Sequence, residues 1–344
     1  MFHGITTQLM GKMAYNVSAP SFDLYSLSHR QMDMHADDEF SKSFDYASGG
    51  TAERFQNPLW PITELFFGAK LRRSIGIVKE FGRSIVASAV EDRKTQEARD
   101  DGVLMPEESK LDQISGSLIQ SLLDAIGNQE MVADAALTYL SAGRDTTGQA
   151  LTWAFYLLMR HRNVLEKIRE EAEKRYRERD ALPTLADFDS TIFTPATMPY
   201  AMAVFYEVLR FYPPIPFEIR QCMKDSVLPD GTMLPKESVI VWCLWAMQRS
   251  KLTWGEDADM FRPERFLEDG KLVSRSASEF PVFYGGSRTC LGKRMAEAIA
   301  VQVIPTMAWL FDFAPLDDKE RVSGSSLTLP MLGGLPVRVM TRTG

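Results

Sequence analysis

The spacing of apolar residues along this chain predicts a mainly helical protein. The longest helical pattern runs from Gln129 to Met159 and is unusually apolar around Ala135–Leu140 and Leu151–Leu158. A helix that is apolar on most of its faces is expected to cross the protein interior. Further helical patterns cover Gln31–Arg54, Ile62–Glu91, Ser115–Ile126, Leu165–Arg177, Pro199–Tyr212 and Lys293–Phe311.

Extended and turn-rich segments predict a minor β portion. The runs Glu218–Met223 and Ser238–Val241 suit a small sheet, and Pro213-Pro214 ends the helix before them because proline lacks the N–H that a helix needs. Between Leu327 and Val339, Gly333-Gly334 flanked by apolar residues predicts a hairpin. The charged stretch from Lys94 to Lys110 reads as an exposed loop, and Trp254 to Phe283 as a loop-rich segment.

The first residues show an apolar spacing typical of an amphipathic helix, in Phe2, Ile5, Leu9 and Met13. A domain rarely opens on a helix with no lead-in and no strong cap, so we expect an N-terminal truncation. No apolar run approaches the roughly 18 residues that span a bilayer, and the start does not resemble a signal peptide. The sequence therefore predicts no membrane anchor in the chain as given.

Composition narrows the class further. The 344 residues allow about two domains, and the net charge of −7 argues against nucleic-acid binding. The three cysteines form no C-x-x-C pair, which favours a reducing compartment and no disulfide framework. The four histidines show no metal-ligand spacing and are expected on surfaces or helix faces: His3, His29, His35 and His161.

One cysteine lies at the end of a glycine-rich loop, in Phe283-Tyr284-Gly285-Gly286-Ser287-Arg288-Thr289-Cys290-Leu291-Gly292. The helical pattern that follows begins near Lys293. Backbone N–H groups of such a loop and of a helix start can stabilise a thiolate, and a flat ligand could lie on the bare backbone. The alternative is a structural cysteine buried in a turn. Such a cysteine needs neither the glycines nor Arg288.

Written as F-x-x-G-x-R-x-C-x-G, this loop resembles the haem-binding signature of the cytochrome P-450 family. The resemblance implies that Cys290 is the axial thiolate of haem b (iron protoporphyrin), in a loop fixed by Phe283, Gly286 and Gly292. It also implies that Arg288 and Arg220 pair with the haem propionates, since guanidinium suits carboxylates. For Arg220 the alternative is a surface strand residue.

The central helix carries a second motif, Ala142-Gly143-Arg144-Asp145-Thr146-Thr147. A mid-helix threonine can donate to the carbonyl four residues earlier, here that of Ala142, and Gly143 leaves room on the same face. The alternative is a glycine-weakened buried helix with a solvent-facing Asp145. Beside the cysteine loop, the motif resembles the family's oxygen-binding helix, which implies that Thr146 is the alcohol and Asp145 the acid that deliver protons.

A third match lies between these two. Glu207 and Arg210 stand three apart, so they share a helix face and can form an ion pair. Phe261-Arg262-Pro263-Glu264-Arg265-Phe266 supplies a second arginine. In the family, an E-x-x-R pair and the arginine of a P-E-R-F segment form a structural triad, here Glu207, Arg210 and Arg265. The matches cover roughly Gln129 to Arg342.

The resemblance implies a mainly α cytochrome P-450 fold, incomplete at its N-terminus. Residues 1–344 would form a single haem-thiolate domain that lacks the anchor, the β-rich region and the first helices. It implies a monooxygenase that takes O2 and receives electrons from a separate NADPH-dependent reductase, because no G-x-G-x-x-G follows a predicted strand. Full-length relatives are expected on the cytosolic face of the endoplasmic reticulum membrane.

A hydrophobic small-molecule substrate is expected from apolar residues at the family's pocket positions: Leu137, Leu140, Ile215, Phe217, Met331 and Leu332. Ala142–Thr147, Ser43–Ala47 and Arg54–Pro58 resemble the fungal branch that hydroxylates alkanes and fatty acids. Two alternatives remain open. The chain could be a non-catalytic remnant with impaired haem binding, or a haem-thiolate isomerase or dehydratase, against which the Asp145-Thr146 pair counts.

Overall fold

The computed structural model describes residues 4, 6, 39–99, 110–178, 190–324 and 326–342. The amphipathic pattern expected over Phe2–Met13 lies almost wholly outside these residues. The chain forms two compact units, one of Met1–Gly148 with Ser325–Leu327 and the other of Gln149–Gly324 with Thr328–Gly344. The single haem-thiolate domain expected over 1–344 stays a prediction.

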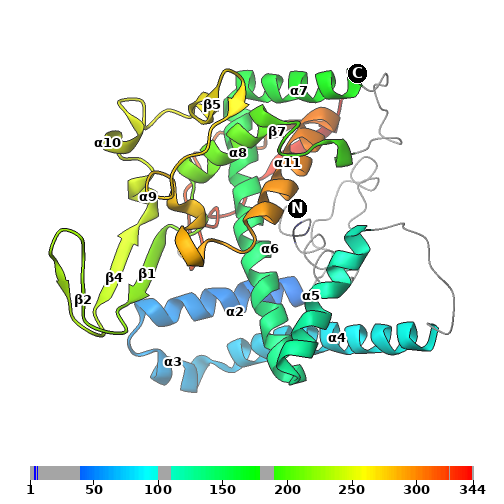
Figure 1. The fold of residues 1–344 in the computed structure, drawn as a ribbon, viewed down its shortest axis with the longest axis vertical. Helices are drawn as coiled ribbons and strands as arrows, with labels where there is room; N and C mark the ends of the chain where they lie inside the picture. The colour runs from blue at the N-terminus through cyan, green and yellow to red at the C-terminus, as the bar shows by residue number, and fades with distance from the viewer. Residues whose placement is uncertain are drawn as a thin grey trace. The chain divides into compact units, whose positions relative to one another are not determined.

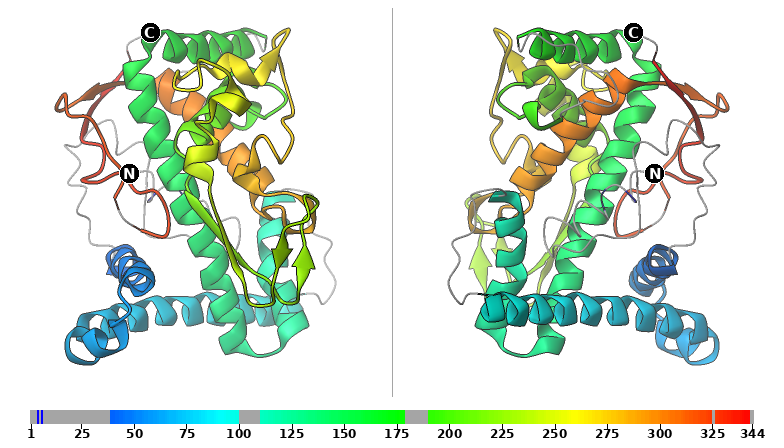
Figure 2. Two further views of the ribbon diagram at one scale, coloured as in Figure 1. Left: turned by 90° about the vertical axis from the view of Figure 1, so that its left-hand side faces the viewer. Right: turned by 90° about the vertical axis from the view of Figure 1, so that its right-hand side faces the viewer.

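The described part of the first unit is helical. Its elements are α2 (Glu39–Gln56), α3 (Trp60–Phe67), α4 (Ala69–Arg99), α5 (Lys110–Ile126) and the first half of α6 (Gln129–Arg160). Figure 2 shows α2 nearly end-on, with the long helix α4 passing beside it. None of the residues of α3 is buried, and its apolar side chains Ile62, Leu65, Phe66 and Phe67 are exposed.

The second unit combines helices with short strands (Figure 1). Its helices are the rest of α6, α7 (Arg162–Arg177), η2 (Ser190–Ile192), α8 (Pro199–Phe211), α9 (Leu244–Met247), α10 (Lys251–Trp254), η3 (Pro263–Phe266), η4 (Pro281–Phe283), η5 (Gly286–Arg288) and α11 (Lys293–Leu310). Its strands are β1 (Phe217–Gln221), β2 (Ser226–Val227), β3 (Met233–Leu234), β4 (Val239–Cys243), β5 (Leu267–Glu268), β6 (Lys271–Leu272), β7 (Phe311–Pro315) and β8 (Val337–Thr341). The mainly α class with a minor β portion is confirmed.

The strands pair antiparallel in four two-stranded sheets, β1 with β4, β2 with β3, β5 with β6 and β7 with β8. The small sheet predicted from the two extended runs is therefore the β1–β4 ribbon. The hairpin predicted around Gly333-Gly334 is wrong in its pairing. Both glycines have positive φ and form a turn, but β8 pairs with β7, which lies more than twenty residues earlier in the sequence.

Several predicted boundaries differ from the structure, and two of the differences have a clear location in the sequence. The helix expected over Ile62–Glu91 is two helices, α3 and α4, which meet at Gly68. A side chain at Gly68 would collide with the carbonyl of Glu64, so only glycine fits this tight junction. The loop expected from Lys94 is helical as far as Arg99, where α4 ends.

Local sequence explains where the central helix begins. Gly127 has a φ of 69° and follows the last residue of α5, as is common at helix C-termini. Asn128 comes next, and its side-chain oxygen accepts hydrogen bonds from the N–H groups of Glu130 and Met131, at 3.0 and 3.2 Å. This side chain caps the first turn of α6.

Within the described residues, no helix is both long and apolar enough to span a membrane.

A buried carboxylate lies at the centre of the second unit. Glu207 and Arg210 on α8 are both 0% exposed, and the Arg210 Nε and Nη2 atoms each lie 2.8 Å from a Glu207 oxygen. Arg265 on η3 adds a contact of 3.3 Å from its Nε to Glu207. The backbone N–H of Arg262 donates to the same carboxylate at 2.8 Å. A buried charge of this kind is tolerated only when it is paired and hydrogen-bonded.

Hydrogen bonds lead from this cluster towards the cysteine loop. Arg210 Nη1 donates to the carbonyl of Gln248 at 2.7 Å, and the Gln248 side chain donates to the carbonyl of Glu279 at 3.1 Å. Phe280, which directly precedes η4, packs on the aromatic core around Trp254 and Phe266. The cluster thus holds the segment that leads into the loop.

Replacing Glu207 by glutamine should lower the free energy of unfolding by about 3–5 kcal/mol, because Arg210 then stays buried without an opposite charge. Urea denaturation followed by circular dichroism measures this loss. The matched control is Glu268→Gln on the exposed face of β5, which should change the value by less than about 0.5 kcal/mol. Similar losses of unfolding free energy in the two variants would contradict the assignment of Glu207 as the carboxylate that compensates the buried charge of Arg210.

Asp257 should make stability depend on acid pH. Its hydrogen bond from Arg265, 2.7 Å long, holds the pKa of Asp257 below the ordinary carboxyl value. The unfolded chain then takes up the proton at a higher pH than the folded chain, so this contribution is present above the ordinary value and is lost as the pH falls below it. The stability of the parent should therefore fall more steeply with decreasing pH than the stability of Asp257→Asn.

Thermal unfolding at a series of pH values below neutral checks this. Asp259→Asn, at an exposed neighbouring position, is the control and should keep the parent's slope. A parent and an Asp257→Asn variant with parallel pH profiles would rule out the linkage.

Candidate functional site

The cysteine loop is built from two short turns that follow Phe280. The backbone N–H of Cys290 donates to the carbonyl of Phe283 at 2.8 Å, which closes the loop. Thr289 ties it from within, because its hydroxyl donates to the carbonyl of Gly286 at 2.9 Å. Cys290 is half-buried and forms no disulfide, and α11 begins three residues later at Lys293. The loop therefore presents a free thiol beside a helix start.

Backbone conformation explains two of the loop's glycines. Gly286 has a φ of 66°, and a Cβ there would meet no atom within 4 Å, so its face is open. At Gly285 a Cβ would lie 2.7 Å from the Cβ of Ala277, which is too close for any other residue. Tyr284, which lies between Phe283 and Gly285, also has a positive φ, of 60°, which is uncommon for a bulky residue. Such strain persists only where surrounding contacts impose it.

The two predicted propionate arginines differ in their surroundings. Arg288 is exposed at the end of η5. Arg220 lies on β1, and its guanidinium carbon is 5.2 Å from the ring centroid of Tyr284 and 5.8 Å from that of Trp242. The Tyr284 contact places β1 next to the cysteine loop. The interpretation of Arg220 as a haem-facing residue is thus compatible with its position, and it stays a prediction.

Glu218, two residues before Arg220, is a feature that the sequence did not reveal. Its side chain is buried, one carboxylate oxygen has no hydrogen-bond partner, and the other is 3.4 Å from Arg220 Nη1. Burial, and after it the neighbouring Glu218 carboxylate, raise the pKa of Tyr284 to about 12. The alternation of polar and apolar residues along this short, mostly exposed strand did not indicate that Glu218 is buried.

The second motif lies in the first unit, on α6. The hydroxyl of Thr146 donates to the carbonyl of Ala142 at 2.7 Å, which is the hydrogen bond that the sequence predicted. Leu137, Leu140, Gly143, Asp145 and Thr146 all lie on this helix; Leu140 is buried, whereas Gly143 and Thr146 are half-buried. Leu137 packs against Gly82 of α4, where a Cβ on the glycine would lie 2.8 Å from the leucine side chain.

Asp145 does not face solvent, contrary to one of the two readings of this helix. Only 13% of its side chain is exposed, and its Oδ1 lies 2.6 Å from Nη1 of Arg144. Burial raises the pKa of Asp145, the charge and hydrogen bond of Arg144 oppose that rise, and the nearby Asp45 adds to it. The carboxylate therefore lies in a largely water-excluded site, where the charge of Arg144 opposes the effect of burial.

The remaining predicted pocket residues lie in the second unit. Ile215 is half-buried and Phe217 exposed after the double proline, and Met331 is buried while Leu332 is exposed at the Gly333-Gly334 turn. These two segments lie side by side, because the N–H of Leu329 donates to the carbonyl of Pro214 at 2.9 Å.

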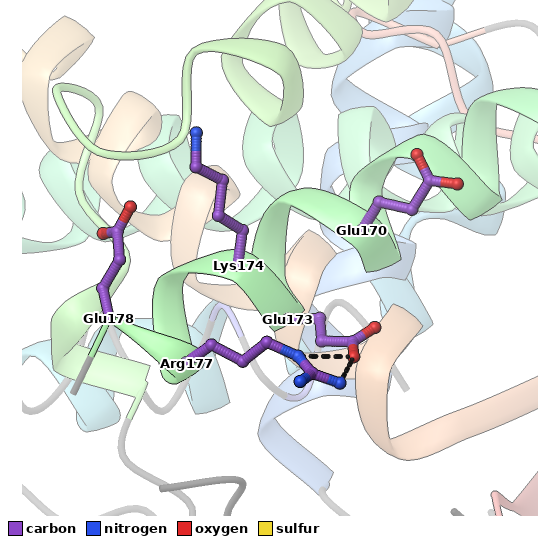
Figure 3. Close-up of a pocket in the computed structure, with 5 residues that line it drawn as sticks. All are labelled: Glu170, Glu173, Lys174, Arg177 and Glu178. Carbon is purple, nitrogen blue, oxygen red and sulfur yellow. Dashed lines mark hydrogen bonds and ion pairs between the residues drawn. The ribbon is translucent and has the colours of Figure 1, made fainter. Parts of the chain in front are cut away.

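A pocket in the second unit lies elsewhere, on α7 (Figure 3). It is lined by the charged residues Glu170, Glu173, Lys174, Arg177 and Glu178, and Arg177 forms an ion pair with Glu173 across it. No predicted site residue lines this pocket. Its charged surface does not match the hydrophobic substrate expected from the sequence.

The second unit offers a donor set that fits haem b. Cys290 supplies a thiol, the ligand type that binds iron in haem-thiolate proteins, and Arg220 and Arg288 supply guanidinium groups suited to carboxylates. The open face at Gly286 leaves room on the loop for a flat ligand, and a Cβ at Gly292 would lie 4.0 Å from the Cys290 sulfur. Nothing in the geometry of this loop conflicts with that group.

A model of the cytochrome P450 family matches residues 6–334 of the chain. Cytochrome P450 94A1 of Vicia sativa is 31% identical over 318 residues, which cover 88% of this chain and 57% of that protein. Cytochrome P450 86B1 of Arabidopsis thaliana is 32% identical over 316 residues, which cover 88% of this chain and 55% of that protein. Cytochrome P450 monooxygenase cyp1 of Mycosarcoma maydis is 33% identical over 321 residues, which cover 89% of this chain and 49% of that protein.

The chain thus spans between 49% and 57% of the length of these three relatives. Plant and fungal proteins match it at similar identity, so the fungal branch stays a prediction. The family match covers nearly all of the chain and includes the cysteine loop, the α6 motif and the Glu207 cluster. The chain belongs to the cytochrome P450 family.

Proposed function

We propose that this chain carries the haem-binding and proton-delivering parts of a haem-thiolate monooxygenase. The observation that carries the proposal is the free, half-buried Cys290 in a loop whose closing hydrogen bond and glycine positions leave the sulfur accessible. Membership in the family supports it, because cytochromes P450 hold their haem iron through a cysteine thiolate. When bound, the haem supplies the oxygen-activating redox chemistry.

In the proposed reaction, one atom of O2 enters a C–H bond of the substrate and the other leaves as water. Two electrons and two protons complete the balance. We assign the electrons to a separate NADPH-dependent reductase, as expected from the missing dinucleotide fingerprint. The protein's own contribution is to hold the cofactor, to bind the substrate and to deliver the protons.

On the cofactor side, Cys290 would be the iron ligand, with Phe283, Gly286 and Gly292 shaping its loop. Arg288 and Arg220 would bind the propionates. The cluster of Glu207, Arg210 and Arg265 would hold the loop in place without touching the haem, since its hydrogen bonds reach the segment that precedes the loop. These roles are what the family resemblance implies for this chain, and each is part of the proposal.

On the proton side, Thr146 and Asp145 would act together, with Gly143 leaving space beside them. The Thr146 hydroxyl can give up its bond to Ala142 and donate elsewhere. Asp145 would be the acid beside it, and burial raises its pKa against the opposing effect of Arg144. An acid of this kind is most useful when both protonation states are accessible near the working pH.

For the substrate we propose a hydrophobic molecule with an alkyl chain, such as a fatty acid or an alkane. The support is the apolar character of the predicted lining residues Leu137, Leu140, Ile215, Phe217, Met331 and Leu332. The Leu329–Pro214 hydrogen bond joins the segments that carry Ile215 and Met331, which supports this part of the proposal.

Replacing Cys290 by serine should abolish thiolate ligation, because a serine hydroxyl is not ionised near neutral pH. The measurement is the absorption spectrum of the reduced, carbon-monoxide-bound protein after expression with haem supplied. The parent should show the red-shifted Soret band of a haem thiolate and the variant should not. Cys243→Ser, another half-buried free thiol, is the control and should keep the band. A parent chain without the band would contradict the proposal and support a non-catalytic remnant.

Replacing Thr146 by alanine should leave haem binding intact and lower the product formed per NADPH consumed by at least about tenfold, as expected for loss of a proton-transfer group. Thr138→Ala is a matched control. Thr138 lies on the same helix and also donates to the carbonyl four residues earlier, at 2.8 Å. Product yields for Thr146→Ala equal to those of the parent would refute the relay. Product formed by the parent without any NADPH consumption would favour the isomerase or dehydratase alternative.

A further inference from the structure

One arginine nitrogen in the first unit serves two carboxylates. Nη1 of Arg144 lies 2.6 Å from Oδ1 of Asp145 and 2.8 Å from Oδ1 of Asp45. Asp145 is the next residue on α6, whereas Asp45 lies on α2, which crosses α6 in Figure 1. A guanidinium nitrogen of this type carries two hydrogens, so each carboxylate can accept one.

Arg144 itself is held firmly. Its side chain is 1% exposed, and its guanidinium carbon lies 4.9 Å from the ring centroid of Phe44, the residue before Asp45. The hydroxyl of Thr6 donates to the carbonyl of Arg144 at 3.0 Å. A buried guanidinium needs an opposite charge, and two consecutive residues of α2 therefore help to fix the position of the arginine.

The two carboxylates are not equivalent. Asp145 is largely buried, so it depends on Arg144 for its charge compensation, whereas 58% of the Asp45 side chain is exposed and water can stabilise its charge. Both bind the same positive group, so each weakens the hold of the other. The strength of the Arg144–Asp145 pair thus depends on how closely Asp45, and with it α2, approaches.

We propose that Arg144 is a positioning residue for the Asp145 acid, and that Asp45 of α2 competes with Asp145 for Arg144 and so sets how tightly that acid is held. A shift of α2 towards Arg144 would loosen Asp145, and a shift away would tighten its pair. The relay part of this inference rests on the proposed function of Asp145. The competition itself rests only on the contacts of the three side chains.

The competition is tested by double-mutant cycles on the unfolding equilibrium of the whole chain, without added haem. Arg144→Gln and Asp145→Asn should show a coupling of about tenfold in the unfolding constant, within the range for residues in contact. In an Asp45→Ala background the coupling should grow at least about threefold, because the competitor is gone. Glu53→Gln, an exposed acid on the same helix, should leave it unchanged. A coupling that Asp45→Ala does not increase would overturn the competition.

The relay part is tested in haem-loaded protein by the ratio of product to NADPH consumed. Arg144→Gln should lower this ratio about as much as Thr146→Ala, since Asp145 loses its orientation. Arg144→Lys should restore at least part of it, because an ammonium can still donate to both carboxylates. Equal ratios for Arg144→Gln and the parent would refute the positioning role. A parent without the haem-thiolate band would remove the proposed function and this role together, whereas the unfolding cycles would still decide the competition.

Discussion

The second unit depends on one charge that water cannot reach. Glu207 is fully buried, and its two oxygens are matched by two arginines and a backbone N–H from α8, η3 and the turn before η3. Pairing of this quality offsets the cost of removing ions from water, and a partial match would not. Because Arg210 also binds the carbonyl of Gln248, and Gln248 binds that of Glu279, the same charge fixes where the chain enters the cysteine loop.

The two motifs use arginine in related ways. In the second unit, Arg210 and Glu207 form a pair in which both charges are fully buried. In the first unit, Arg144 is equally buried, but Asp45, one of the acids that it binds, is open to solvent. A fully buried ion pair is costly to break, which suits a part that must stay fixed. In the first unit, water can stabilise the charge of Asp45 in place of Arg144.

Much of this architecture could be predicted from the sequence. The strongly apolar helix Gln129–Arg160 and the proline-terminated helix α8 were expected within one or two residues of their observed bounds, because periodicity and proline act locally. The Glu207–Arg210 pair also follows from spacing on one helix. By contrast, the partner of β8 depends on a segment far away in the sequence, and the Gly333-Gly334 turn carries no information about it. The burial of Arg144 and Glu218 was equally hidden, since a charged residue on a helix or short strand ordinarily faces water.

The short helix α3 has a practical consequence for anyone who handles the isolated chain. Its isoleucine, leucine and phenylalanine side chains form an exposed apolar surface that no other described part of the chain buries. Uncovered faces of this kind make proteins self-associate and adsorb to hydrophobic resins as concentration rises. Substituting Phe66 and Phe67 with serine would give a more tractable sample for spectroscopy, and would leave the cysteine loop and the α6 motif unaltered.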